Sequence, residues 1–182
     1  MAENSKKSGK RYLIFCVEIL IAAVLVLADQ LIKKAVVANI KGQEDIVLIK
    51  NVIGLTYAEN TGAAFSFMSD YTTVLSVFTS ILLLACIAVL LSGKVKSKLM
   101  HTGIVMIIAG GAGNLIDRFA QGYVVDYIET LFVNFPIYNF ADILVTCGVA
   151  VVCIRLIYET VTEEKRKKTE TNTDGADANG QA

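Results

Sequence analysis

Four long apolar runs divide the chain, and each is bounded by polar segments. The runs cover residues 12–28, 74–91, 99–116 and 140–158. Each has about the 20 residues that a helix needs to cross the roughly 30 Å hydrocarbon core of a bilayer. The pattern predicts an all-α membrane protein with four transmembrane helices. Residues 1–161 form one domain in this interpretation, and the polar residues 162–182 form a disordered cytoplasmic tail.

The segment between the first two spans has a different pattern. Residues 31–40 alternate apolar positions with Lys33 and Lys34, which suits a short helix lying at the membrane interface. Residues 46–50 and 54–57 are β-prone and flank a turn-like Asn51, so we expect a small β element here. The small and polar residues 59–66 follow, a composition that is more often a turn than a site.

Composition supports the membrane assignment. Hydrophobic residues make up 54% of the chain, mean hydropathy is +0.57, and only 19% of residues are charged. These values are too apolar for an ordinary soluble domain of this length. Net charge is zero, which gives no reason to expect a nucleic-acid partner. The four cysteines lie in apolar runs without metal-ligand spacing, so we expect neither a metal nor another cofactor.

The distribution of basic residues predicts the orientation of the chain. Eleven lysines and arginines fall on the side of the membrane that holds the N-terminus and tail, and five fall on the other side. Because cytoplasmic loops carry the excess of basic residues, both termini are predicted to be cytoplasmic. The outer ends of the spans then collect a group of polar residues. These are Asp29, Asn60, Asn114, Asp117, Asp126, Asn139 and Asp142.

Three of these acids, Asp117, Asp126 and Asp142, lie between the end of the third apolar run and the first residues of the fourth. Carboxylates at membrane depth are expensive and usually serve an ion path, a proton relay or a reaction. Two carboxyls close together in a partly dry site share one proton and titrate as a coupled unit. Such a pair can hydrolyse a peptide bond without a metal, since one acid activates water while the other polarises the carbonyl.

Two other interpretations of the acids remain open at this point. They could form a proton pathway, as in a proton-coupled transporter or channel component. They could also pair with Lys33, Arg118 and backbone amides to fix the helix ends, and Arg118, which adjoins Asp117, could neutralise one acid of the cluster. Asn114 and Asp117 are three residues apart, and so are Asn139 and Asp142. Each pair can therefore share a helix face.

Five short motifs, in this order and at matching membrane depth, resemble those of the lipoprotein signal peptidases, also called signal peptidase II. These are aspartic proteases of the bacterial cytoplasmic membrane. The resemblance spans nearly the whole chain before the tail. The motifs are Asp29-Gln30-Leu31 with Lys33, Asn60-Thr61-Gly62-Ala63-Ala64-Phe65-Ser66, Gly113-Asn114-Leu115-Ile116-Asp117-Arg118, Val124-Val125-Asp126-Tyr127-Ile128 and Asn139-Phe140-Ala141-Asp142.

The resemblance implies that Asp126 and Asp142 are the catalytic dyad, with the active site at the outer face of a multi-pass protein. It implies a prolipoprotein substrate cleaved just before a diacylglyceryl-modified cysteine, in contact with membrane lipid, by an enzyme expected to be a monomer. Residues 119–135 could form a lid. The residues expected to support the dyad or bind substrate are Asp29, Lys33, Asn60, Gly62, Asn114, Asp117, Arg118, Asn139 and Ala141.

Overall fold

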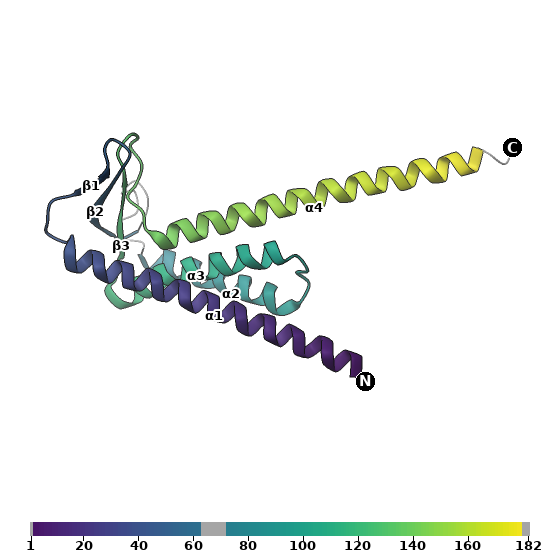
Figure 1. Ribbon diagram of the computed structural model, residues 1–182, viewed down its shortest axis with the longest axis horizontal. Helices are drawn as coiled ribbons and strands as arrows, with labels where there is room; N and C mark the ends of the chain where they lie inside the picture. Colours follow the sequence, from purple (N-terminus) through teal and green to yellow (C-terminus); the bar gives the residue numbers. More distant parts are fainter. Residues whose placement is uncertain (1, 63–71, 180–182) are drawn as a thin grey trace.

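The computed structural model describes the backbone of residues 2–62 and 72–179, and the side chains of residues 13–62 and 72–166. The end of the second motif, residues 63–66, lies outside the described residues. The described residues form four helices and three strands (Figure 1). In order they are α1 (Ala2–Asn39), β1 (Ile46–Ile49), β2 (Ile53–Asn60), α2 (Thr72–Ser92), α3 (Lys98–Gln121), β3 (Val124–Thr130) and α4 (Phe140–Asn179).

Each helix contains a stretch that is long and apolar enough to cross a membrane, which confirms the four predicted spans. The stretches are Leu13–Asn39, Thr72–Ser92, Lys98–Gln121 and Phe140–Arg166. The span in α3 is the most buried, because it packs against the other three helices. Small residues permit its close contact with α4: a Cβ on Gly103 would lie 2.9 Å from the Gly148 carbonyl oxygen.

Two helices are longer than predicted. The predicted interfacial helix at residues 31–40 is the continuation of α1, which ends at Asn39. Val36 and Ile40 pack against Val125 and Tyr127 of β3, so tertiary contacts hold this end in line with the span. At the other end of the chain, α4 extends to Asn179, beyond residue 158, where the predicted fourth span ends.

The β element is an antiparallel sheet with the strand order β1-β2-β3. β1 and β2 confirm the predicted β segments, whereas β3 was not predicted as a strand. Its register pairs Ala58 with Asp126 and Asn60 with Val124, which places Asn60 beside the acid of β3. The sheet lies at one end of the helical bundle, and both chain termini lie at the other (Figure 1). The bundle thus presents one polar end, to which the sheet is attached.

Candidate active site

Buried polar side chains form one layer where the sheet meets the helices. They come from α1, α3, β3 and the start of α4, and most have under a tenth of their surface exposed. The buried members are Asp29, Lys33, Asn114, Asp117, Asp126 and Asn139. This confirms that residues far apart in the sequence meet in one layer. The layer divides into two groups of acids with different partners.

The first group is centred on Lys33, which is almost completely buried. Its Nζ lies 3.0 Å from Asp29 Oδ2 and 2.9 Å from Asp117 Oδ2, and donates a 2.8 Å hydrogen bond to Asn114 Oδ1. The Gln30 amide also donates to Asp117, at 3.0 Å. Asp29 and Lys33 share a face of α1 because they are four residues apart. The lysine therefore compensates two buried carboxylates at once.

Gly113 makes this arrangement possible. A Cβ at Gly113 would lie 2.5 Å from Asp29 Oδ2, so only glycine lets α1 and α3 approach this closely. Ala141, which is fully buried, lies against the same stretch of α3: a Cβ on Gly110 would collide with its carbonyl oxygen. The predicted supporting role of Ala141 is therefore a packing role, because a larger side chain would separate α4 from α3.

The second group contains Asp126 and Asp142, and its contacts are to amides. Asp126 is 1% exposed. It accepts hydrogen bonds from Asn60 Nδ2 at 2.8 Å and from Asn139 Nδ2 at 2.6 Å. Burial raises the pKa of Asp126 to about 6, an effect that the Asn60 hydrogen bond opposes and the negative charge of Asp142 reinforces. Asp126 therefore holds a proton to a much higher pH than an ordinary aspartate.

Asp142 is held by the first turn of α4. The Asn139 side-chain oxygen accepts from the Asp142 backbone N–H at 3.0 Å, and Asp142 Oδ2 accepts from the Asn139 N–H at 3.0 Å. This reciprocal pair is a capping box, which explains the three-residue spacing of the fifth motif. Asn114 Nδ2 donates to the other carboxylate oxygen at 2.7 Å. Two hydrogen-bond donors and the positive end of the helix dipole therefore meet at this carboxyl group.

Asn139 joins the two acids. Its side-chain amide donates to Asp126, while its backbone N–H donates to Asp142. The same side-chain amide also reaches Asn114 Oδ1, at 3.1 Å, and the carbonyl of Val125. Gly62 contributes at the edge of the site, where its backbone N–H donates to Asn60 Oδ1 at 3.1 Å and so turns the Asn60 amide nitrogen toward Asp126. The orientation of both carboxyls is therefore fixed by neutral groups.

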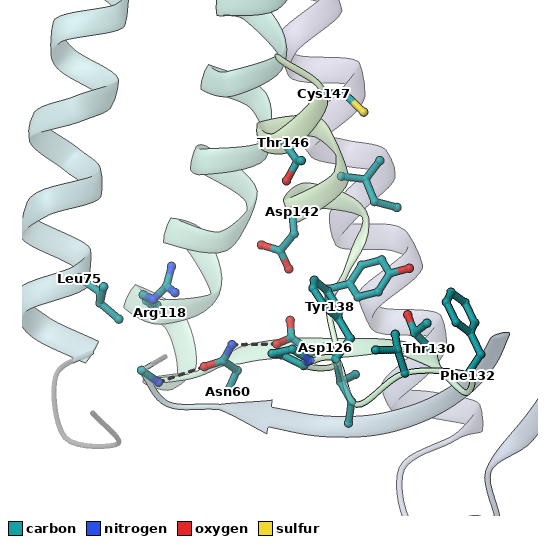
Figure 2. Close-up of a pocket in the computed structure, with 16 residues that line it drawn as sticks. Asn60, Leu75, Arg118, Asp126, Thr130, Phe132, Tyr138, Asp142, Thr146 and Cys147 are labelled. Atoms are coloured by element: carbon teal, nitrogen blue, oxygen red, sulfur yellow. Dashed lines mark hydrogen bonds between the residues drawn. The ribbon is translucent and has the colours of Figure 1, made fainter. Parts of the chain in front are cut away.

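Arg118 was predicted to support the site or bind substrate, and to be able to neutralise one acid of the cluster. Lys33, not Arg118, pairs with Asp117. The Arg118 side chain lines a cavity together with Asp126 and Asp142 (Figure 2), and its Nε is buried with no hydrogen-bond partner among the described residues. Its guanidinium therefore supplies positive charge to the cavity. Gln30 and Tyr127 also have roles that residue types alone did not reveal: the Tyr127 hydroxyl accepts from the Phe140 N–H at the start of α4.

The cavity has a volume of about 830 Å³ and a largely apolar wall. Leu75 of α2, the loop after β3, and Ile143 and Cys147 of α4 form this wall, while the acid pair and Asn60 form the polar end. The carboxyls are thus accessible from a space that runs along a membrane-spanning helix. Such a cavity suits an elongated apolar ligand with one polar group at the acids.

Fold and site together define a multi-pass membrane protein with a pair of carboxylic acids at the polar end of an apolar cavity. Residues 21–158 match the family model described as signal peptidase (SPase) II. The chain therefore belongs to the signal peptidase II family, and it is a bacterial membrane peptidase.

Curated relatives agree with this assignment. The chain is 40% identical over 145 residues to the lipoprotein signal peptidase of Streptococcus pneumoniae, covering 78% of this chain and 95% of the relative. It is 38% identical to that of Lactococcus lactis subsp. lactis, with 80% and 96% covered. A solved bacterial membrane enzyme matches with a TM-score of 0.71 at 32% identity, covering 79% of this chain and 89% of that one. The proton-coupled transporter is not favoured.

Proposed function

We propose that this signal peptidase II removes the signal peptide from prolipoproteins by aspartic catalysis, with Asp126 and Asp142 as the dyad. The observation that carries the proposal is that these two acids share Asn139 and line one cavity, while the other two buried acids of the layer are bound to Lys33. Among the described residues, only the first pair lines the cavity and makes no direct ion pair with a lysine or arginine.

The different surroundings of Asp126 and Asp142 suggest which of the two acids carries the proton. Asp126, whose pKa is raised to about 6, is the protonated partner and donates to the scissile carbonyl oxygen. Asp142, which accepts from Asn114 and the Asn139 backbone, is the ionised partner and takes a proton from the attacking water. The water oxygen bonds to the carbonyl carbon and gives a tetrahedral diol. On collapse the C–N bond breaks, the departing nitrogen receives the proton held by Asp142, and the diol returns one to Asp126.

The cavity supports a substrate that arrives through lipid. Its wall includes Ile143 and Cys147, which lie on the membrane-spanning part of α4. A signal helix and the acyl chains of a diacylglyceryl-modified cysteine can enter along this wall, and the peptide bond then meets the dyad at the membrane surface. Asn60 and Arg118 at the polar end are placed to bind the substrate backbone.

The topology follows from the distribution of basic residues. The sheet and the acid pair face the extracytoplasmic side, and both termini face the cytoplasm, because the lysine-rich segments lie at the end of the bundle opposite the sheet. One chain supplies both catalytic acids and their amide partners, so the enzyme acts as a monomer.

Cleavage of a purified diacylglyceryl-modified prolipoprotein tests the dyad directly. Asp126→Asn and Asp142→Asn each lower the turnover rate by about 10²–10⁴-fold, the contribution of general acid–base catalysis. The matched control is Asp45→Asn, which changes an exposed acid just before β1 and leaves the rate unchanged. Thermal unfolding of each variant shows that it is folded. Wild-type turnover by either dyad variant contradicts the assignment, and cleavage of an unmodified precursor at the same rate contradicts the substrate.

A further inference from the structure

The loop that follows β3 carries large apolar side chains on its surface. Phe132 is 70% exposed, Phe135 54% and Val133 50%, and Leu131 is also exposed. Four of the five residues from 131 to 135 are thus large and apolar. Exposed apolar groups of this size mark a surface that contacts a partner or a membrane. We call residues 131–135 the apolar loop.

The apolar loop projects beyond the helical bundle. β3 carries the chain away from Asp126 to Thr130, which pairs with Ile53, so the loop begins about 13 Å from the catalytic acid at 3.3 Å per strand residue. The chain then returns to α4 through Tyr138, which pairs with Ile128. In Figure 1 the strands run across the direction of α1, α2 and α3. Because those helices cross the membrane, the strands lie along its surface.

Local contacts hold the apolar loop in place. The Leu131 N–H donates to the Val52 carbonyl at 3.0 Å, which ties the loop to the turn between β1 and β2. The Phe135 ring packs edge-on against Tyr138, with centroids 5.7 Å apart. The Phe132 side chain remains the most exposed of the large apolar side chains in the loop. Figure 2 shows Phe132 at the far end of this region from Asn60, with its ring on the side from which the helices rise.

The surface beneath the apolar loop belongs to the membrane-spanning part of α4. Phe132, Ile143 and Cys147 border the same cavity. Ile143 and Cys147 lie in the first two turns of a span, so Cys147 is about 10 Å into it at 1.5 Å per helical residue. In a bilayer, lipid fills the space beside an exposed helix face at this depth. The apolar loop is therefore continuous with a surface that already contacts lipid.

We propose that the apolar loop inserts into the adjacent membrane leaflet, with the Phe132 ring at the boundary between headgroups and acyl chains. Aromatic side chains prefer this boundary, and burying the Phe132 ring there removes apolar surface from water. The occupant is bilayer lipid, because the ring points toward the membrane from a sheet lying on it. The consequence is that the outer wall of the cavity rests in lipid and opens to it, whatever reaction the acids perform.

The absence of tryptophan from the sequence allows a direct test. Phe132→Trp places a single reporter on the apolar loop of the full chain, in vesicles of phosphatidylglycerol and phosphatidylethanolamine. We expect blue-shifted emission, loss of most of it when the lipids are brominated near the glycerol end of the chains, and little quenching by aqueous iodide. Val133→Trp gives the same result if Phe132→Trp does not fold.

Two matched reporters calibrate the measurement. Gln43→Trp lies on the exposed turn between α1 and β1 and is quenched by iodide but not by brominated lipid. Phe78→Trp lies on an exposed face of the α2 span and is quenched by brominated lipid alone. A loop reporter that behaves like the Gln43→Trp reporter overturns the proposal. A reporter shielded from both quenchers also overturns it, since protein then covers the loop, either a second copy of this chain or another segment.

Discussion

The buried polar layer contains two groups of acids, and the two groups differ in the side chains that bind them. Asp29 and Asp117 share the ammonium of Lys33, at 3.0 and 2.9 Å. Asp126 and Asp142 share Asn139, and their other hydrogen bonds come from the amides of Asn60 and Asn114. The first pair is therefore fixed by a charged base. The second pair is held by neutral amide donors, and burial raises the pKa of Asp126 to about 6, so this acid can exchange a proton during a reaction.

The difference shows why acidic residues alone do not reveal a site. Asp117 has conspicuous neighbours in the sequence, with Asn114 three residues before it and Arg118 directly after it. In the structure it receives hydrogen bonds from Gln30 and pairs with Lys33, and it accepts the Val125 N–H at 3.2 Å. It therefore holds β3 in position rather than facing the cavity. The group around Lys33 builds the platform that carries the second group.

Lys33→Met removes the base from the group of Asp29 and Asp117, which then resembles the group of Asp126 and Asp142. We expect this change to have the largest effect on stability. It leaves two buried carboxylates without their base, and breaking a buried ion pair from one side destabilises a protein by about 3–5 kcal/mol. Unfolding of the purified protein in detergent measures this loss.

The matched control for Lys33→Met adds Asp29→Asn and Asp117→Asn in the same chain. This fully neutral variant recovers most of the lost stability, because no charge then remains without a partner in this group. If Lys33→Met unfolds like the wild type, the lysine does not compensate these acids and the contrast between the two groups fails.

The sequence predicted the spans and the layer because both depend on local patterns. Four apolar runs of sufficient length and the bias of the basic residues place the acids at one end of the bundle, and the Asn139-x-x-Asp142 spacing is itself a helix-start signal. The choice of Asp126 over Asp117 came from the family resemblance. Residue types could not supply it, because which acid meets Lys33 depends on how α1 packs against α3.

Other parts of the structure depend on contacts between residues far apart in the sequence, which a local sequence pattern does not contain. The strand at residues 124–130 forms because β2 offers a partner edge, although its apolar stretch resembles many loops near a membrane. The predicted interfacial helix became part of α1 because Val36 and Ile40 found a hydrophobic cluster on the sheet. Which acids Arg118 accompanies also depends on packing, because its side chain lines the cavity with Asp126 and Asp142 although Asp117 is its neighbour in sequence.

Substitutions of Asn139 can separate two contacts in the group of Asp126 and Asp142. One is the helix cap at the start of α4, and the other is the amide hydrogen bond to Asp126. Asn139→Ser keeps a helix-capping oxygen but loses the amide that donates to Asp126, whereas Asn139→Ala loses both. A neutral hydrogen bond contributes about 0.5–1.5 kcal/mol, so we expect both variants to lose about 2- to 10-fold in turnover.

Stability distinguishes the two Asn139 variants. Asn139→Ala loses about 1 kcal/mol more than Asn139→Ser, which is the value of a helix cap. Turnover is measured on a purified prolipoprotein and stability by thermal unfolding of the same samples. Wild-type turnover by Asn139→Ser shows that the amide does not orient the dyad, and equal stability of both variants shows that the cap is not made.

The smallest expected effect is on the pH dependence of kcat/KM, which the pKa of Asp126 sets. The Asn60 amide opposes the rise in the pKa of Asp126, so Asn60→Ala raises this pKa further above about 6. In the proposed mechanism Asp126 must carry a proton, and kcat/KM is therefore full below its pKa and lost as pH rises through it. A neutral hydrogen bond of about 0.5–1.5 kcal/mol moves this loss to higher pH by about 0.4–1 unit.

The profile of kcat/KM against pH measures the shift, with Asn39→Ala as the control because Asn39 donates only to a carbonyl at the end of α1. This control leaves the alkaline limb where the wild type has it. An Asn60→Ala limb that moves to lower pH contradicts the assignment of Asp126 as the protonated partner, because loss of a donor to its carboxylate can only favour the protonated form. If the alkaline limb of Asn60→Ala does not move, the titrating group is not Asp126. The contrast between an acid pair held by Lys33 and an acid pair held by amides then does not explain the activity.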